Sequence, residues 1–390
     1  MEPTIDLSFS TTSPLSSSTG WWNKDTVAVV TGANKGIGFA LVKRFAEVGL
    51  TVVLTARDRE RGERAVESLK EKGLHGVRFF PLDVSQPDSI KTFVSWFETQ
   101  FGVLDILVNN AAVSFNDINQ NSVEHAETVI KTNFFGSKIL TESLLPFFRL
   151  SPSISRILNI SSRLGSINKM RNPNIKSILQ SKKLSVEQIE WVVNCFLEDV
   201  RGGTWESRGW PQVWTDYAVS KLALNAYARV LAGRYEGRGL SVNCFCPGFT
   251  QTAMTGGRGT HTADDAAQVG VRLALLPPEE LPTGKFYIGE QSSKHYNQAI
   301  SRVLEGFTVD LISLFNNTSL QFSACKMAGY NSLAPKTKNL IIAGGLSAFV
   351  FGVYFYTMKA VGGTDELQVA IDKFEEQKKQ EAQANMAPKA

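Results

Sequence analysis

Between residues 26 and 289, short runs of apolar residues alternate with longer stretches in which apolar residues recur every three or four positions. A short, continuously apolar run is typical of a strand buried on both faces, and the longer periodic stretches are typical of amphipathic helices. This alternation predicts an α/β protein, a doubly wound Rossmann fold with a seven-stranded parallel sheet between two layers of helices. The predicted strands are residues 26–31, 51–56, 77–82, 104–110, 155–161, 240–246 and 285–289.

Helical periodicity fills most of the intervals between these runs. The interval 163–211 is longer than the others and has a helix of its own, because Ser185 and Gln188 have the spacing of a capping box and Gly202-Gly203 ends the apolar pattern that follows them. We therefore expect an inserted helical segment within the sheet domain. The other predicted helices are residues 39–48, 59–72, 88–100, 126–150 and 217–235.

The two ends of the chain differ from this domain. Residues 1–20 are rich in Ser and Thr, contain Glu2 and Asp6, and have no Lys or Arg, which argues against a signal or transit peptide and predicts a disordered leader. The sheet domain is predicted to span residues 21–295, followed by a linker at 296–335.

Residues 339–358 are 20 consecutive residues without a charge, and lysines flank them on both sides. Twenty residues with a helical rise of about 1.5 Å each match a bilayer core of about 30 Å. The segment 336–390 is therefore predicted to be a single transmembrane helix at 339–358 with a charged helical tail in water. A buried helix of a soluble domain is the alternative.

A glycine-rich turn stands between the first predicted strand and the first predicted helix, where residues 31–38 read Thr-Gly-Ala-Asn-Lys-Gly-Ile-Gly. Glycines at such a junction let the main chain turn tightly and approach a pyrophosphate, which the helix N-terminus stabilises. The turn predicts a dinucleotide site, with an ordinary glycine turn as the alternative. Its binding residues would be Gly32, Asn34, Lys35, Gly36, Ile37 and Gly38.

The charge at the end of the second predicted strand indicates which dinucleotide is bound. An acidic residue there would accept a hydrogen bond from a ribose 2′-hydroxyl, whereas a cation favours a 2′-phosphate. The strand ends in Thr55-Ala56-Arg57, and Lys35 adds a positive charge from the glycine turn. We therefore predict NADP as the cofactor.

A tyrosine and a lysine four residues apart, Tyr217 and Lys221, begin the last long predicted helix. This spacing puts the phenol and the ammonium group on one helical face. The ordinary pKa of tyrosine is about 10, so a cation that stabilises the phenolate would make it a better acid near neutral pH. The pair predicts acid-base chemistry on a bound ligand, although the same spacing also occurs on exposed helices.

Further polar motifs lie at the ends of the predicted strands: Asp83, Asn109-Asn110-Ala111, Ser161-Ser162 and Pro247-Gly248. Another, Asn133 in Lys-Thr-Asn-Phe-Phe-Gly, lies in the predicted helix 126–150. With these motifs, residues 21–289 resemble the classical branch of the short-chain dehydrogenase/reductases. The resemblance is strongest to the plant carbonyl-reductase-like group that includes menthone and salutaridine reductases. It implies NADPH-dependent reduction of a ketone or aldehyde to an alcohol, reversible as an alcohol dehydrogenase.

The resemblance also implies four catalytic residues. Tyr217 would donate a proton to the carbonyl oxygen, and Ser162 would polarise the same oxygen. Lys221, beside Tyr217 in the cofactor site, would hydrogen-bond the nicotinamide ribose and lower the pKa of Tyr217. Asn133 would hold a water that relays protons to Lys221.

For the rest of the cofactor, the resemblance implies that Asp83 contacts the adenine and that Asn110 holds the ribose and the central strand. A purely structural cap is the alternative for both residues. Thr250, after Pro247 and Gly248, would anchor the carboxamide, or it is simply a loop threonine.

Family members with an insertion like residues 163–211 are monomeric, so the resemblance implies a monomeric catalytic domain. Three tryptophans precede Tyr217 after this insertion, and they either line the substrate pocket or belong to the core. They are Trp205, Trp210 and Trp214.

Residues 327–383 resemble a small single-span cytochrome c oxidase assembly factor of mitochondria. Two interpretations stay open: a fusion that anchors a reductase to a membrane, or a join of two neighbouring genes with Met327 as an original start. An anchor would leave the catalytic domain facing the cytosol. A soluble cytoplasmic protein and a protein of the mitochondrial inner membrane are the alternatives.

The composition excludes other classes of function. The net charge of +4 comes from acids and bases that are interspersed, which argues against a nucleic-acid partner. Four cysteines and four histidines lack the spacing of a metal site. A non-catalytic reductase fold in a membrane scaffold is a further alternative, against which the complete set of four catalytic residues argues. The expected partner is a small-molecule carbonyl compound.

Overall fold

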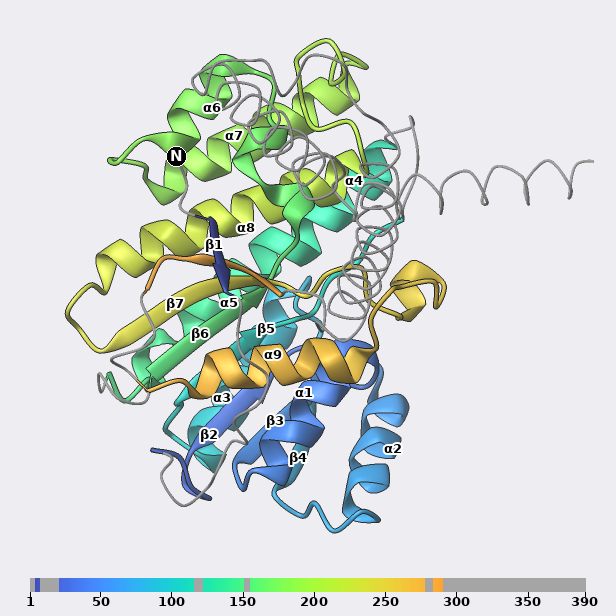
Figure 1. The fold of residues 1–390 in the computed structure, drawn as a ribbon, viewed down its shortest axis with the longest axis vertical. Helices are drawn as coiled ribbons and strands as arrows, with labels where there is room; N and C mark the ends of the chain where they lie inside the picture. Colours follow the sequence, from blue (N-terminus) through green and yellow to red (C-terminus); the bar gives the residue numbers. More distant parts are fainter. Residues whose placement is uncertain (1–3, 8–20, 116–121, 151–154, 278–282, 290–390) are drawn as a thin grey trace, which may run out of the picture. The chain divides into compact units, whose positions relative to one another are not determined.

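A computed structural model of the chain describes residues 4–7, 21–115, 122–150, 155–277 and 283–289. They include an eight-stranded, entirely parallel sheet with the strand order β1-β8-β7-β6-β5-β2-β3-β4 (Figure 1). The strands are β1 Thr4–Leu7, β2 Val27–Val30, β3 Thr51–Ala56, β4 Val77–Pro81, β5 Ile106–Asn109, β6 Ser155–Ile160, β7 Leu240–Cys246 and β8 Phe286–Gly289.

All seven predicted strands are present, and β3 and β7 match their predicted bounds at both ends. The eighth, β1, extends the sheet beside β8, with Thr4 opposite Phe286 and Leu7 opposite Gly289. Residues 4–7 were predicted to belong to a disordered leader, and this does not hold for them. Main-chain hydrogen bonds to a free sheet edge add this strand, and a pattern of side chains does not reveal such bonds.

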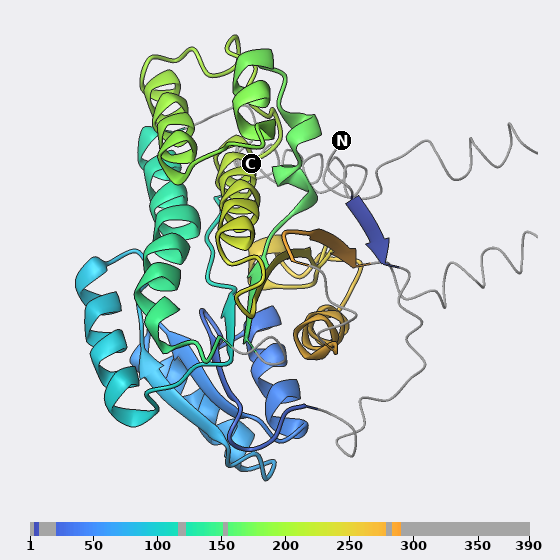
Figure 2. The same ribbon diagram turned by 90° about the vertical axis from the view of Figure 1, so that its left-hand side faces the viewer.

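Two hydrophobic cores lie on opposite faces of the sheet. Along β2, Val27 and Val29 belong to one core and Ala28 and Val30 to the other, which is why the strand is apolar at every position. Figure 2 shows α1 and α9 on one side and α8 on the other. The helices are α1 Gly36–Glu47, α2 Arg59–Lys70, α3 Pro87–Gln100, α4 Val123–Ile130, α5 Ser137–Leu144, α6 Pro173–Gln180, α7 Val186–Arg201, α8 Thr215–Arg234 and α9 Ala263–Leu275.

The strand order reverses direction at β2. The chain runs outward from β2 through β3 to β4, and then returns to place β5 on the other side of β2. Val30 near the end of β2 is therefore opposite both Leu54 of β3 and Val108 of β5. Loops that leave the carboxyl ends of these strands diverge at this point, which is where doubly wound sheets bind their ligands.

The inserted segment 163–211 contains two helices, α6 and α7, of which only α7 was predicted. The predicted capping box is confirmed, because the Gln188 main-chain N–H donates to Ser185 Oγ and the Ser185 N–H donates to Gln188 Oε1. Helix α7 packs against α4 and α8. An ion pair between Arg201 and Glu127, 2.6 Å from Nη2 to Oε1, joins α7 to α4.

The predicted helix 126–150 is widened in the middle. Residues Lys131–Gly136 form one π-helical turn between α4 and α5. Such a turn accommodates one more residue than an α-helical turn and is frequent at functional sites. Asn133 lies in this turn and is fully buried.

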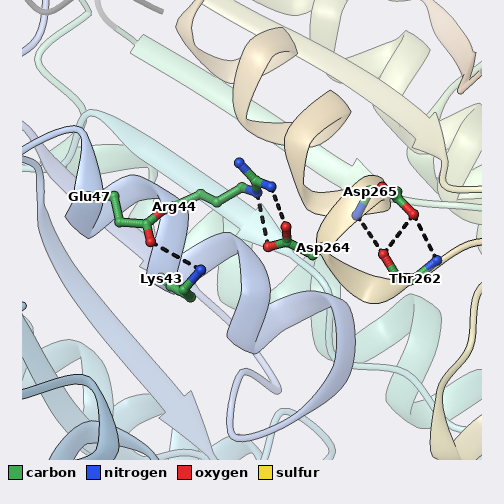
Figure 3. A network of polar contacts seen from close by, with 6 residues as sticks. All are labelled: Lys43, Arg44, Glu47, Thr262, Asp264 and Asp265. Carbon is green, nitrogen blue, oxygen red and sulfur yellow. Dashed lines mark hydrogen bonds and ion pairs between the residues drawn. The ribbon is translucent and has the colours of Figure 1, made fainter. Parts of the chain in front are cut away.

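Two helices on one side of the sheet, α1 and α9, are joined by a two-point ion pair (Figure 3). Arg44 Nε donates to Asp264 Oδ1 over 3.1 Å, and Arg44 Nη2 contacts Asp264 Oδ2. Thr262 and Asp265 cap the first turn of α9 reciprocally. The helix that begins at the glycine turn is thereby fixed to α9, which was not predicted.

The chain divides into two units, residues 1–291 and 292–390. The predicted linker 296–335, the predicted span 339–358 and the charged tail lie outside the described residues. No helix among the described residues is long and apolar enough to cross a membrane.

Candidate active site

The glycine turn after β2 needs glycine at three positions for different reasons. Gly32 and Gly36 have positive φ angles, +61° and +59°, which residues other than glycine rarely adopt. A Cβ at Gly32 would lie 2.8 Å from Ala111 Cα, and a Cβ at Gly38 would lie 2.4 Å from Asn110 Nδ2. Helix α1 begins at Gly36. The main-chain N–H groups of its first turn, which have no acceptor within the helix, therefore lie at the glycine turn.

Asn110, at the end of β5, supports the glycine turn. Its Nδ2 donates to the main-chain oxygens of Thr31 and Gly32 over 2.8 and 3.1 Å. Thr31 Oγ1 in return accepts from the N–H groups of Asn110 and Ala111. Asn110 therefore has a structural role, because its side chain ties the loop after β5 to the loop after β2.

The exposed side of the turn is positively charged. Lys35 and Arg57 are both exposed, and within the described part of the chain neither forms an ion pair. Asn34 is half-buried beside Lys35, whereas Ile37 packs against the core. These two cations at the end of β3 and in the turn fit a 2′-phosphate.

Asp83 is used locally. Its Oδ1 accepts from the main-chain N–H and the hydroxyl of Ser85, over 2.9 and 2.7 Å. These bonds give Asp83 the structural role of shaping the turn after β4. Its other carboxylate oxygen takes no part in them.

Lys221 is buried at the carboxyl end of β6. Its Nζ donates to the main-chain oxygen of Ile160 over 2.7 Å and lies 5.4 Å from the centroid of the Tyr217 ring. Gly165, in the loop after β6, packs so closely on α8 that a Cβ there would lie 2.5 Å from the Lys221 carbonyl carbon. Burial lowers the pKa of Lys221 to about 8.

Tyr217 is partly buried, and its pKa is raised well above the ordinary value, mainly by desolvation. The sequence predicts that Lys221 lowers this pKa. That effect stays a prediction; removal from water disfavours the phenolate, and in the structure the Lys221 ammonium donates to Ile160. Tyr217 therefore holds its proton at neutral pH.

The π-helical turn directs Asn133 toward the loop after β5 and toward α8. Its Oδ1 accepts from the Val113 N–H over 2.8 Å, and its Nδ2 donates to the Val113 oxygen and to Ser220 Oγ. Ser220 Oγ in turn donates to the Tyr217 main-chain oxygen over 2.7 Å. The side chain of Asn133 thus ties the loop after β5 to the helix that carries Tyr217.

Ser162 follows Ile160 by two residues, so it lies at the same strand end as the Lys221 ammonium group. Its hydroxyl accepts from the Leu164 N–H over 3.2 Å. A hydroxyl has one donor besides its acceptor sites, so this bond leaves the proton available for a ligand oxygen. The preceding Ser161 donates to Asn225 Oδ1, one turn beyond Lys221.

The loop after β7 returns to the glycine turn. The Thr250 hydroxyl is buried and donates within its own turn, to the main-chain oxygens of Pro247 and Gly248. Thr252, which the sequence motifs do not single out, faces the turn instead: its Cγ2 would lie 3.5 Å from a Cβ at Gly36. Only the folded loop shows this proximity.

The three tryptophans before Tyr217 have different surroundings. Trp210 is a core residue, since its ring packs edge-on against Phe196 and its Nε1 donates to Asp199 Oδ2. Trp205 packs against the same core. Trp214 is buried but belongs to neither of the two cores. Its backbone is left-handed, with φ +44°, at the start of α8.

Known proteins share this fold and resemble this chain in sequence. The chain matches the family described as short chain dehydrogenase over residues 26–174, and the one described as enoyl-(acyl carrier protein) reductase over residues 204–276. (+)-Neomenthol dehydrogenase of Arabidopsis thaliana is 39% identical over 290 residues, covering 68% of this chain and 97% of that enzyme.

Two further relatives agree. Carbonyl reductase (NADPH) 1 of Mus musculus is 37% identical over 270 residues, covering 67% of this chain and 95% of that enzyme. The solved structure of salutaridine reductase from Papaver somniferum superposes with a TM-score of 0.63 at 38% identity, covering 67% of this chain and 99% of that one.

These findings define an oxidoreductase with a Rossmann-like fold. The chain belongs to the short-chain dehydrogenase/reductase family, and plant menthone and salutaridine reductases are among its homologues. The two family matches lie within the sheet domain. They do not support the assembly-factor resemblance of residues 327–383.

Proposed function

We propose that the protein reduces the carbonyl group of a small ketone or aldehyde to an alcohol with NADPH. The observation that carries this proposal is the arrangement of Tyr217 and Lys221 on one helix face at the end of β6. Relatives named as carbonyl reductase and neomenthol dehydrogenase support the substrate class. The bound nicotinamide would supply the hydride to the carbonyl carbon.

The protein residues would supply the proton and hold the substrate. Tyr217 is protonated at neutral pH, as its ordinary pKa of about 10 already requires, and it would donate its proton to the carbonyl oxygen as the new C–H bond forms. Ser162 would donate a hydrogen bond to the same oxygen, and Lys221 would bind the ribose hydroxyls. Asn133 would support the proton path to Lys221. In reverse, the oxidised nicotinamide would accept a hydride from the alcohol carbon, and the Tyr217 phenolate would accept the hydroxyl proton.

The cofactor site would consist of the glycine turn, which Asn110 supports through hydrogen bonds, and of exposed cations. Main-chain amides at Gly36, Ile37 and Gly38 would bind the pyrophosphate at the N-terminus of α1. Arg57 and Lys35 would select the 2′-phosphate of NADPH. The rest of the dinucleotide would contact Asp83, Asn110, Pro247, Gly248 and Thr250.

The catalytic acid can be tested directly. Tyr217→Phe should lower kcat for carbonyl reduction by about 10²- to 10⁴-fold, the usual contribution of a general acid, while the Kd for NADPH stays unchanged. A panel of ketones and aldehydes followed by NADPH absorbance measures the effect. Tyr227→Phe, on the same helix, is the matched control, because the buried Tyr227 hydroxyl has no hydrogen-bond partner among the described residues. Equal activity in both variants would refute the role of Tyr217.

Cofactor choice should follow the charge at residue 57. Arg57→Asp should weaken NADPH binding and shift the ratio of kcat/KM values toward NADH by about 10²-fold, since it removes one cation and adds one anion near the 2′-phosphate. Steady-state kinetics with both cofactors measures this ratio. An unchanged preference would contradict the assignment of Arg57.

The pKa of Lys221 predicts a pH dependence of cofactor affinity. The protonated ammonium favours an anionic cofactor, and the pKa of about 8 in the free protein means that this charge is lost as pH rises through 8. The Kd for NADPH should rise by up to about tenfold per pH unit above pH 8, while a phosphate with a second pKa of about 6 stays fully ionised. Fluorescence titration from pH 7 to 9.5 tests this. Lys221→Met should bind more weakly with no such slope, and a parallel slope would contradict the assignment.

We also propose that the catalytic domain is monomeric. Helix α7 of the insertion packs against α4 and α8, so it would occupy the place that a second copy would need in order to pair through α8. Light scattering on a chain ending at residue 295 should give the mass of one copy. A stable dimer would refute this proposal.

A further inference from the structure

The loop after β7 turns back on itself and brings His261 beside Gly248. The His261 main-chain N–H donates to the Phe249 oxygen over 3.2 Å, and Thr250 and His261 form a parallel bridge. Gly259 allows the two limbs of the loop to approach this closely, because a Cβ there would lie 2.0 Å from the Thr250 carbonyl carbon. Main-chain contacts therefore fix the position of His261.

The His261 ring lies against a glycine that has already been assigned to the proposed active site. A Cβ at Gly248 would lie 3.4 Å from both Cδ2 and Nε2 of His261, so this edge of the ring faces Gly248. The histidine is half-buried. Nε2 thus lies beside the main chain that directly follows β7.

This part of the loop is joined to the loop that carries Ser162. Cys246, the last residue of β7, accepts a hydrogen bond at Sγ from the Arg163 N–H over 3.3 Å, and Ser162 immediately precedes Arg163. Gly248 follows Cys246 by two residues, which span at most about 7 Å. A carbonyl compound bound at Ser162 would therefore lie beside the loop that carries His261.

The hydrogen bonds of the imidazole determine which nitrogen carries the proton in its neutral form. Nδ1 of His261 lies 2.8 Å from Thr260 Oγ1, and the Thr260 hydroxyl donates to the Phe249 oxygen over 3.2 Å. A hydroxyl has one proton, so Thr260 Oγ1 accepts from an Nδ1–H group, and Nε2 keeps its lone pair.

Nε2 has no hydrogen-bond partner within the described part of the chain. The acid nearest along the chain is Asp264, which pairs with Arg44, and Asp265 Oδ2 accepts from the N–H and the hydroxyl of Thr262. The neutral imidazole of His261 therefore offers an acceptor at Nε2, and it suits a ligand group that donates a hydrogen bond.

We propose that His261 selects carbonyl substrates that carry a hydroxyl group, by accepting a hydrogen bond from that hydroxyl at Nε2. This inference rests on the proposed carbonyl reduction and adds a feature of the substrate to it. A methyl ether has no proton to donate, so a hydroxyketone should be preferred over the ketone with the corresponding methyl ether.

The test compares His261→Asn and His261→Gln with His75→Asn in the full chain. Asparagine can keep a donor near the Nδ1 position but has no group at the Nε2 position, whereas glutamine can place an acceptor there. His75 is exposed and lies between α2 and β4, so it controls for the loss of a histidine elsewhere. Steady-state kinetics with NADPH use cyclohexanones and acetophenones with a hydroxyl at each ring position, and their methyl ethers. Thermal unfolding checks that each variant folds.

The wild type should prefer at least one hydroxyketone over its methyl ether by about 3- to 10-fold in kcat/KM, the contribution of one neutral hydrogen bond. His261→Asn should lose this preference, mainly through a higher KM for the hydroxyketone, because the bond is already made in the bound substrate. His261→Gln should keep part of the preference, and His75→Asn should match the wild type. Equal losses with both members of each pair would show a merely structural role and overturn the proposal.

Nitrogen NMR gives a readout that does not depend on turnover. The Tyr217→Phe protein with bound NADP⁺ should react slowly in either direction, and His261 should be in its Nδ1–H tautomer. The preferred hydroxyketone should shift the ¹⁵N resonance of Nε2 in the direction of an accepted hydrogen bond, and its methyl ether should not. An Nε2–H tautomer, or equal shifts with both compounds, would contradict the assignment.

Failure of the underlying function gives a different result. If the wild type reduces no member of a wide panel of ketones and aldehydes, carbonyl reduction itself is refuted. If it reduces ketones but no hydroxyketone, or if wild type and His261→Asn show the same ratio of hydroxyketone to methyl ether, only the selection by His261 is refuted.

Discussion

The active-site end of the molecule depends on the hydrogen bond between the buried Lys221 ammonium and the main-chain oxygen of Ile160. A buried charge without a partner costs several kcal/mol, so this bond is what makes the position of Lys221 tolerable. It also fixes α8 to β6, a strand in the interior of the sheet. Gly165, in the loop after β6 that also carries Ser162, has no side chain, and this allows α8 to pack directly on that loop.

Burial shifts the pKa values of the two titrating groups of α8 in opposite directions, and both groups still carry their protons at pH 7. It raises the pKa of Tyr217 and lowers that of Lys221, favouring the neutral form of each. A pKa of about 8 still leaves Lys221 charged at pH 7. The free site therefore holds a phenol and an ammonium, both protonated, which is the state that the proposed proton transfer to a carbonyl oxygen requires.

The strands and the positions of the motifs could be predicted from the sequence because a parallel sheet buries both faces of each strand and gathers the loops at one edge. The elements that were missed obey other constraints. Strand β1 depends on main-chain pairing, and the π-helical turn at Asn133 leaves the apolar periodicity almost unchanged. Contacts between loops, such as Thr252 with Gly36, arise only when distant strands are assembled. The effect of burial on Tyr217 likewise depends on the surroundings of the helix rather than on the spacing to Lys221.

The support that Asn110 gives the glycine turn has a consequence for how such a protein changes over time. The turn is held from inside by two amide hydrogen bonds before any ligand arrives, so little conformational entropy remains to be lost when a pyrophosphate binds. The cations that face the solvent, Lys35 and Arg57, take no part in that internal support. Under the proposed assignment, substitutions among them would alter which nucleotide is preferred without loosening the turn, so nucleotide preference could drift between descendants while the architecture beneath it persists.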